Sequence, residues 1–289
     1  MTNYYNESTI VFYDDAFVKA ADAKTDLYSQ TLHYGAGVFE GIRAYDTPNG
    51  TKIFKAVEHY QRLLYSAEKM LIKHNYSVEQ LIDITYEVLK RNNLTNAYIR
   101  PLMFLGPNMS LSFNPEVHFM LCVWKWDKYM GNNLLNLNVS SYQRPNPNSC
   151  HVDAKITGHY VNSILATVEA KSKGFDEALL LDGNGNVAEG AGANFFLEKD
   201  NTLYTPAKGN ILPGITRSVI IQLAEKNNIP VMEKDFTTEF VKQADSAFFV
   251  GTAAEITGIG TVNEYEFPKK WENTLGHFLS KKYSEYTLS

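Results

Sequence analysis

The chain has 289 residues, enough for two domains of ordinary size. Its apolar fraction of 44% and charged fraction of 20% are typical of a folded globular protein and exclude a disordered chain. The net charge of -5 gives no electrostatic reason to expect nucleic acid or an anionic membrane as a partner, and no apolar run is long enough to cross a bilayer. The N-terminus lacks the basic segment and apolar core of a secretory signal, so we expect a cytoplasmic protein.

Several familiar site patterns do not occur in the sequence. The two cysteines, Cys122 and Cys150, form no CxxC pair, so we expect free thiols. The seven histidines are scattered without HExxH or Cys/His spacing, so no metal site is predicted. The glycine spacing of "GAGVFEG" at 35–41 is wrong for a dinucleotide loop, and there is no GxSxG hydrolase elbow.

The first half of the chain is expected to mix strands and helices. Residues 8–20 predict a short hairpin, and residues 51–70 a strand that runs into an amphipathic helix. A second amphipathic helix is predicted at 78–93, and strands at 96–106 and 117–126. Gly-Asn-Asn at 131–133 breaks this pattern, so we place a first domain at 1–130 and a linker at 131–138.

The second domain is expected to span 139–289. Residues 136–142 predict a strand, and residues from about 158 to 172 a helix with Ile164, Leu165 and Val168 on one face. Residues 177–206 predict three strands, the first two joined by Asp-Gly and Asn-Gly turns. A loop then enters a helix within 211–228, and residues 245–259 predict a strand that ends in a turn of small residues. The buried stripe of that helix is expected to be Val219, Ile220, Leu223 and Ala224.

Two stretches of this second half suggest a site. Lys155 lies where the loop "RPNPNS" runs toward a helix, a place where a lysine is usually a solvated surface residue. From Glu189 the chain reads "EGAGANFFLEKDNTLYTPAKGNILPGITR", in which an acid sits among small residues and a Gly and a Thr open a helix. A helix N-terminus suits a phosphate, although a structural turn with a Thr cap explains the helix start equally simply. Together, an amine, a carboxylate and a phosphate cradle are the parts that hold pyridoxal phosphate.

These residues also resemble a known family. The stretch with Glu189, Asn194, Phe196, Thr205, Leu212, Gly214, Thr216 and Arg217 resembles the signature of the class IV aminotransferases, the fold-type IV pyridoxal phosphate enzymes. The segments "LHYGAGVFEGIRAY", "EHYQRL", "NLTNAYIRPL", "EGAGANFF", "LPGITR" and "GTAAEIT" follow one another as in the branched-chain amino acid aminotransferases. The resemblance covers nearly the whole chain.

The resemblance implies an α+β fold of the D-amino acid aminotransferase type. It has a small N-terminal α/β domain, a larger C-terminal pseudo-barrel domain that carries the cofactor lysine, and pyridoxal 5'-phosphate between them. The resemblance also implies a homo-oligomer, a dimer or a hexamer, in which a loop of one small domain completes the partner's pocket. Here that loop is "GPNMSLSFNP" at 106–115, whose wording departs from the glycine-rich version of bacterial members and leaves the details of selectivity open.

The family's functional residues can be carried over one by one. Lys155 matches the lysine that forms the Schiff base and moves the proton between substrate and cofactor. Glu189 matches the acid that keeps the pyridine nitrogen protonated, and Tyr160 the residue that hydrogen-bonds the ring's phenolic oxygen. The remaining cofactor-binding residues, chiefly around the phosphate, are expected to be Arg62, Leu212, Ile215, Thr216 and Thr252.

The substrate site must accept an apolar side chain in one half-reaction and the distal carboxylate of glutamate in the other. Tyr98 and Arg100 alternate on one strand and so share a face, which supplies a hydroxyl and a guanidinium side by side. Thr252 and Ala253 are expected to offer backbone amides to the α-carboxylate. The apolar wall is expected to consist of Tyr34, Phe39, Trp126 and Tyr129.

We therefore predict a ping-pong transaminase that acts on L-leucine, L-isoleucine or L-valine and 2-oxoglutarate. Three alternatives stay open at this point. They are a D-amino acid transaminase and an aminodeoxychorismate lyase of the same fold, and a ligand-binding protein without catalysis.

Overall fold

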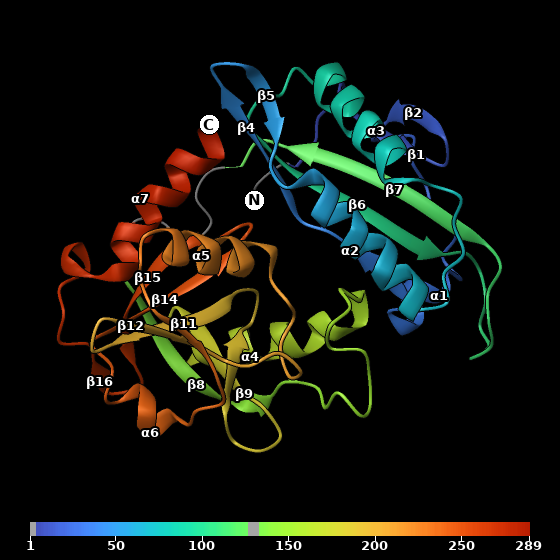
Figure 1. The fold of residues 1–289 in the computed structure, drawn as a ribbon. Coiled ribbons are helices and arrows are strands. Elements are labelled where there is room, and N and C mark those ends of the chain that lie inside the picture. Colours follow the sequence, from blue (N-terminus) through green and yellow to red (C-terminus); the bar gives the residue numbers. More distant parts are fainter. Residues whose placement is uncertain (1–3, 127–132) are drawn as a thin grey trace. The chain divides into compact units, whose positions relative to one another are not determined.

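The computed structural model describes residues 4–126 and 133–289, and the chain divides into two compact units (Figure 1). The first unit consists of Met1–Asp127, Ala154–Gly158 and Leu288, and the second of Lys128–Asp153, His159–Thr287 and Ser289. The expected linker at 131–138 falls partly outside the described residues, and strand β8 (Leu135–Gln143) occupies its later part. The domains 1–130 and 139–289 stay a prediction.

The first unit is built on a seven-stranded sheet in which all neighbouring strands are antiparallel. Along the sheet the order is β2-β1-β7-β6-β4-β5, and β3 also pairs with β6. The hairpin and the strands that we expected in the first half are confirmed. The strands are β1 (Ile10–Tyr13), β2 (Ala16–Lys19), β3 (Gly37–Phe39), β4 (Ile42–Thr47), β5 (Gly50–Ile53), β6 (Ala97–Leu105) and β7 (Val117–Trp124).

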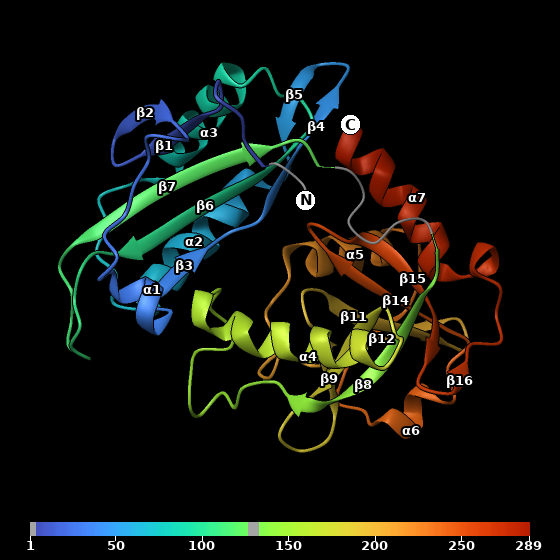
Figure 2. The ribbon, with the colours of Figure 1, turned by 180° about the vertical axis from the view of Figure 1, so that it is seen from behind.

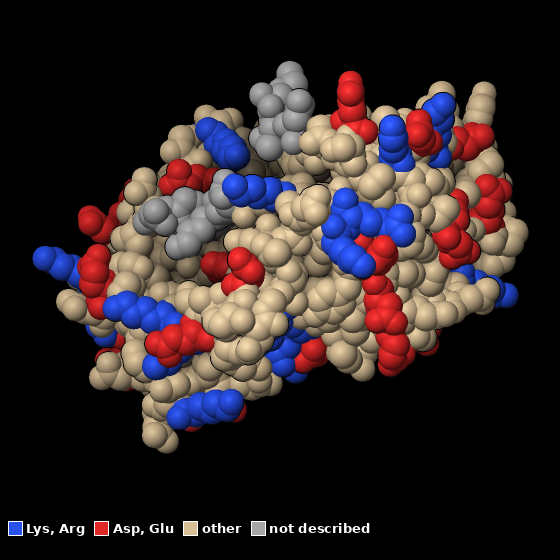
Figure 3. Space-filling model, turned by 90° about the horizontal axis from the view of Figure 1, so that it is seen from above, with Lys and Arg blue, Asp and Glu red and all other residues tan. Residues whose placement is uncertain are grey.

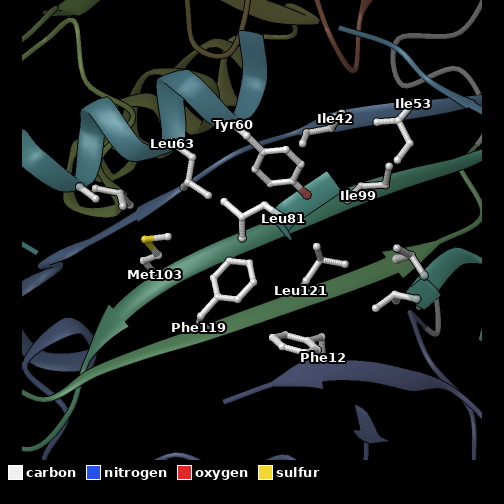
Figure 4. Close-up of a cluster of buried hydrophobic side chains, with 14 of the residues drawn as sticks. Phe12, Ile42, Ile53, Tyr60, Leu63, Leu81, Ile99, Met103, Phe119 and Leu121 are labelled. Atoms are coloured by element: carbon white, nitrogen blue, oxygen red, sulfur yellow. The ribbon is translucent and has the colours of Figure 1, made fainter. Parts of the chain in front are cut away.

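Helices of the first unit pack on this sheet. Besides the short α1 (Gln30–Tyr34), they are α2 (Ala56–Lys69) and α3 (Val78–Arg91), the two amphipathic helices predicted from the sequence. A capping box between Ser77 and Gln80 fixes the start of α3. Figure 4 shows the core between the helices and the central strands, where Leu63 and Leu81 meet Met103 and Leu121, all with zero exposure.

The second unit contains a sheet that closes on itself. Its order is β10-β9-β8-β15-β14-β11-β12-β13, with β16 paired to β15, and an additional pairing joins β10 to β11. This pairing, Glu189 opposite Asn194, closes six strands into a ring, so the expected pseudo-barrel and the α+β class are confirmed. Besides β8, the strands are β9 (Glu177–Leu181), β10 (Val187–Gly190), β11 (Asn194–Lys199), β12 (Thr202–Thr205), β13 (Val231–Glu233), β14 (Ser246–Gly251), β15 (Glu255–Val262) and β16 (Tyr265–Glu266).

The prediction of three strands within 177–206 was wrong, because the structure forms four. The run "EGAGANFF" reverses direction at Ala191–Ala193, so that β10 and β11 are separate antiparallel strands. Periodicity could not reveal this reversal, since the small residues on either side of it are as compatible with one strand as with two.

Helices of the second unit are α4 (Tyr160–Ser172), α5 (Ile215–Lys226), α6 (Thr238–Val241) and α7 (Leu275–Leu288). The expected buried stripe of α5 is confirmed, since its four residues are at most 9% exposed. Helix α4 lies along β8 and β9 (Figure 2) and buries Ser163, Ala166 and Ala170. Ile164, Leu165 and Val168 share its opposite, exposed face.

No described helix is long and apolar enough to cross a bilayer. On the face drawn in Figure 3, acidic and basic side chains lie side by side. Mixed signs of this kind largely cancel at a distance.

Candidate active site

Glu189 is the buried acid of the second unit. It lies on β10 with 5% of its surface exposed. The Nε atom of Arg144 lies 2.9 Å from its Oε1 atom, and the backbone N-H of Leu212 donates to the same oxygen at 3.1 Å. The side-chain amide of Asn194 donates to Oε2 at 3.0 Å. These positive and N-H groups suit a carboxylate anion away from water.

The strand register gathers other predicted residues at the same end of the barrel. Asn194 pairs with Glu189 on one side and with Val250 on the other. Strand β14 ends one residue later at Gly251, which pairs with Glu255 across a tight turn. The turn holds Thr252 and Ala253, so the proposed amides for a carboxylate lie two strands from Glu189.

Helix α5 begins at this end too. The amide of Asn194 also donates to the carbonyl of Leu212 at 3.0 Å, two residues before the helix N-cap, Gly214. A Cβ at Gly214 would collide with Oδ1 of Asn194, so a larger residue could not pack here. Ile215 and Thr216 supply the first helical N-H groups, and no acidic residue occupies the first turn. Such an end attracts a phosphate.

Arg217 belongs to the same signature, but its side chain contacts the strands β12 and β13. Its guanidinium is 3% exposed and contacts the Glu233 carboxylate at 2.7 Å and the Pro206 carbonyl at 2.9 Å. It therefore ties α5 to the ends of β12 and β13.

Lys155 belongs to the first unit, within the segment Ala154–Gly158. Its backbone N-H donates to the Ser66 hydroxyl of α2 at 2.9 Å, and its carbonyl accepts from the Phe39 N-H at 3.1 Å. The Nζ atom lies 4.9 Å from the centroid of the Phe39 ring. The backbone of Lys155 is thus held by a helix and a strand.

Arg62 lies on α2, one turn before Ser66, and its side chain is 12% exposed. Its Nε and Nη2 atoms donate to the two carboxylate oxygens of Glu40 at 2.6 and 3.0 Å. Glu40 also accepts from Nδ1 of His59 at 2.7 Å. Sequence reasoning missed Glu40 and His59, although both lie inside quoted motifs, and His59 stands one helical turn before Arg62.

Most of the predicted substrate residues of the first unit gather on one sheet face. Nη2 of Arg100 donates to the Tyr98 hydroxyl at 3.3 Å, and the guanidinium carbon lies 4.7 Å from the Phe39 ring centroid. The Tyr98 ring is 5.0 Å from both the Trp124 and the Trp126 rings. Gly41 leaves room for it, because a Cβ there would collide with the Tyr98 hydroxyl.

Arg43 is a second arginine on this face that sequence reasoning missed. It pairs with Tyr98 across β4 and β6 and is 6% exposed. Within the described residues, its Nε and Nη1 atoms have no hydrogen-bond partner. Strand alternation could have indicated its position. Ile42 and Ala44 on either side point into the core, so Arg43 must point to the opposite face of the sheet.

The remaining predicted residues lie as follows. Tyr34 is 46% exposed and donates through its hydroxyl to the Met109 carbonyl in the 106–115 loop at 3.1 Å. Tyr160 is the first residue of α4. Tyr129 lies outside the described residues. The first unit therefore holds Tyr34, Phe39, Arg62, Tyr98, Arg100, Trp126 and Lys155, and the second holds Tyr160, Glu189, Leu212, Ile215, Thr216, Thr252 and Ala253.

Comparison with known proteins decides the family. A family model described as "Amino-transferase class IV" matches residues 37–262. The chain belongs to the class IV aminotransferases. A branched-chain-amino-acid aminotransferase of Pseudomonas aeruginosa is 44% identical over 260 residues, which cover 88% of this chain and 85% of the relative.

Solved structures of branched-chain aminotransferases agree with this one over nearly their whole length. The enzyme of Thermoproteus uzoniensis with norvaline has a TM-score of 0.93 at 35% identity, covering 97% of this chain and 95% of its own. The enzyme of Thermobaculum terrenum, solved in its PLP-form, has a TM-score of 0.91 at 27% identity, with 98% and 94% covered.

The Glu189 cluster predicts the effect of a small change at Asn194. Asn194→Asp removes the donor shared by Glu189 and Leu212 and puts a second carboxylate beside the first. We expect the free energy of unfolding to fall by about 1–3 kcal/mol, the cost of unsatisfied buried groups. Urea titration measures it, with Asn201→Asp in the exposed β11–β12 turn as the matched control. Equal stability of the two variants would contradict the role given to Asn194.

Proposed function

We propose that this protein is a pyridoxal phosphate-dependent transaminase that moves the amino group between L-leucine, L-isoleucine or L-valine and 2-oxoglutarate. The observation that carries the proposal is the buried Glu189 carboxylate, held by three groups beside the start of α5 in a class IV chain. The substrate class follows the relatives, which are named branched-chain aminotransferases. Those names favour it over the D-amino acid transaminase and the lyase.

The described residues fit this cofactor. The buried Glu189 carboxylate offers the negative charge that a protonated pyridine nitrogen needs. Leu212, whose N-H donates to Glu189, lies two residues before the N-cap of α5, and the open N-terminus of that helix suits a phosphate. When bound, pyridoxal phosphate supplies the carbonyl and the electron-withdrawing ring that transamination requires. We assign the phosphate to Arg62, Ile215, Thr216 and Thr252, with Leu212 beside the ring.

Each assigned residue has a defined task. Glu189 holds the proton on the pyridine nitrogen, and Arg144 and Asn194 hold Glu189. Lys155 anchors the cofactor through its amine and then moves the proton at the substrate α-carbon. Tyr160 donates to the phenolic oxygen of the ring.

The substrate face supports a dual specificity. Phe39 and Trp126 offer apolar surface, while Tyr98 and Arg100 offer a hydroxyl and a guanidinium that contact each other. We assign the distal carboxylate of glutamate to Arg100, the apolar side chains to the rings with Tyr34, and the α-carboxylate to the Thr252–Ala253 turn.

We also propose that the protein acts in the cytoplasm as a homo-oligomer, a dimer or a hexamer. An apolar face of α4 supports an assembly of copies, because Val161, Ile164, Leu165 and Val168 follow helical spacing and are 43–61% exposed. In the 106–115 loop, Leu111 is 87% exposed. A contiguous apolar face of this kind is rare on a monomer and usually marks a surface that binds another protein.

Sedimentation velocity tests the assembly. We expect the wild type to sediment as a dimer or larger species at micromolar concentration. Ile164→Glu, which puts a charge in the centre of the α4 face, should shift the distribution toward smaller species. The matched control is Gln222→Glu, which adds an acid to an exposed position of another helix, α5, and should change nothing. If Ile164→Glu left the distribution unchanged, the α4 face would not be part of the interface between copies.

The role of Lys155 is tested by Lys155→Ala. Because the amine anchors the cofactor and moves the proton, we expect turnover to fall by at least about a thousandfold, about 4 kcal/mol, while circular dichroism stays that of a folded chain. The yellow absorbance of the wild-type holoenzyme should be lost. Transamination by the variant close to the wild-type rate would refute the assignment.

The role of Arg100 separates the two half-reactions. Arg100→Leu removes a charge-assisted contact to the distal carboxylate of glutamate, worth about 1.5–3 kcal/mol, or roughly ten- to hundredfold in kcat/KM. L-Leucine has no such carboxylate and should be affected much less. Each half-reaction is followed alone by the spectral change of the cofactor. Equal losses with L-leucine and L-glutamate would give Arg100 a structural role.

A further inference from the structure

Glu40 carries a charge with no exposure to solvent. It connects β3 to β4, and its carboxylate is surrounded by Arg62 and His59 of α2. Burying an ionised carboxylate is costly unless donors and an opposite charge replace water. Here four donated hydrogen bonds do so, two from Arg62, one from His59 and one from the Gly41 backbone N-H.

The protonation states follow from these contacts. Burial by itself raises the pKa of Glu40, but the nearby Arg62 and His59 hold that pKa well below its usual value. Burial lowers the pKa of His59, and the charges of Arg62 and Lys155 lower it further, against the attraction of Glu40. At neutral pH the cluster therefore consists of a Glu40 anion, an Arg62 cation and a neutral His59 that donates through Nδ1.

The same contacts orient Arg62. With Nε and Nη2 on the two oxygens of one carboxylate, the guanidinium plane cannot rotate without breaking both bonds. A lysine in this place would be a point charge without that orientation. The Glu40 side chain is itself fixed by His59.

A chain of bonds connects this cluster to Lys155. The Ser66 hydroxyl donates to the Arg62 carbonyl at 2.8 Å and accepts from the Lys155 N-H at 2.9 Å. Phe39, the neighbour of Glu40, binds the Lys155 carbonyl through its own N-H. Phe39 and Glu40 at the end of β3, together with one turn of α2, thus hold both the Lys155 backbone and the Arg62 guanidinium.

We infer that Glu40 and His59 are positioning residues that orient the Arg62 guanidinium toward the cofactor phosphate. The inference rests on the proposed function, which assigns the phosphate to Arg62. It adds that the affinity for the phosphate depends on a carboxylate that does not touch the cofactor. If Glu40 acted as general scaffolding, its loss would weaken all ligands of the site alike.

The test compares two ligands that differ in the phosphate alone. Apoenzyme is titrated with pyridoxal 5'-phosphate and with pyridoxal, and dissociation constants are obtained by equilibrium dialysis. We expect Glu40→Gln to weaken pyridoxal 5'-phosphate at least about tenfold, which corresponds to about 1.4 kcal/mol, and to leave pyridoxal within about twofold. Glu58→Gln, which removes a partly exposed carboxylate of the same helix, should change neither constant.

Arg62→Lys separates this inference from the proposed function. It should produce the same selective loss, and the double variant Glu40→Gln/Arg62→Lys should lose little more than either single variant, because both act through one contact. No selective loss in Arg62→Lys would refute the phosphate assignment itself. A selective loss in Arg62→Lys together with none in Glu40→Gln would overturn the positioning role alone.

His59→Leu keeps the inference testable if Glu40→Gln does not fold. It removes one donor to Glu40 and leaves the Arg62 pair in place, so we expect a smaller loss for pyridoxal 5'-phosphate, about threefold to tenfold. The affinity for pyridoxal should again be nearly unchanged. Equal weakening of both ligands, or of neither, would overturn the inference.

Discussion

The contact between Glu189 and Asn194 is the constraint on which the second unit depends. Their pairing closes the ring of strands, and the Asn194 amide then binds both the Glu189 carboxylate and the carbonyl of Leu212. Asn194 therefore takes part in closing the barrel through its backbone, while its side chain holds the acid and the approach to α5. The same contact explains why residue 214 is a glycine, since any Cβ there would collide with the Asn194 side chain. The fold and the chemistry share these atoms, which makes the stretch from 189 to 217 recognisable as one motif.

In the first unit, the segment Ala154–Gly158 is held in place by long-range contacts. This segment is distant in sequence from the sheet it joins, yet its backbone bonds to Phe39 and Ser66, and Ile156 pairs with Val38. The Thr157 hydroxyl donates to the carbonyls of Gly35 and Gly37. Lys155 is thereby held on both sides of its own backbone. A long, flexible side chain benefits from such a base, because its remaining freedom lies in the side chain alone.

The sequence was informative where a feature is local and uninformative where it is a long-range pairing. Helices α2, α3 and α5 were predictable because their apolar spacing repeats over three turns. The roles of Lys155 and Glu189 were inferred from motifs of fixed order, and they stay predictions. The reversal at Ala191–Ala193 was missed, since small residues carry no periodic signal. The Glu40–Arg62 pair was missed for another reason: its members lie 22 positions apart, and each alone resembles an ordinary surface charge. Helix α4 shows the limit of periodicity itself, because its regular apolar face is the exposed one.

Arg100 shows how one surface can suit both apolar and charged substrates. Its guanidinium lies over the Phe39 ring and within 5.4 Å of the Tyr98 ring centroid, so among the described residues it lies against aromatic faces and forms no ion pair. A guanidinium is weakly hydrated and stacks on such faces, which lets it stay charged there at a lower cost than an ammonium group. The rings that accept the cation also offer apolar area to an aliphatic side chain. A neighbouring carboxylate would have neutralised Arg100 and competed with glutamate, whereas an aromatic setting keeps the charge available. The two demands on the proposed substrate face are therefore met by one choice of neighbours.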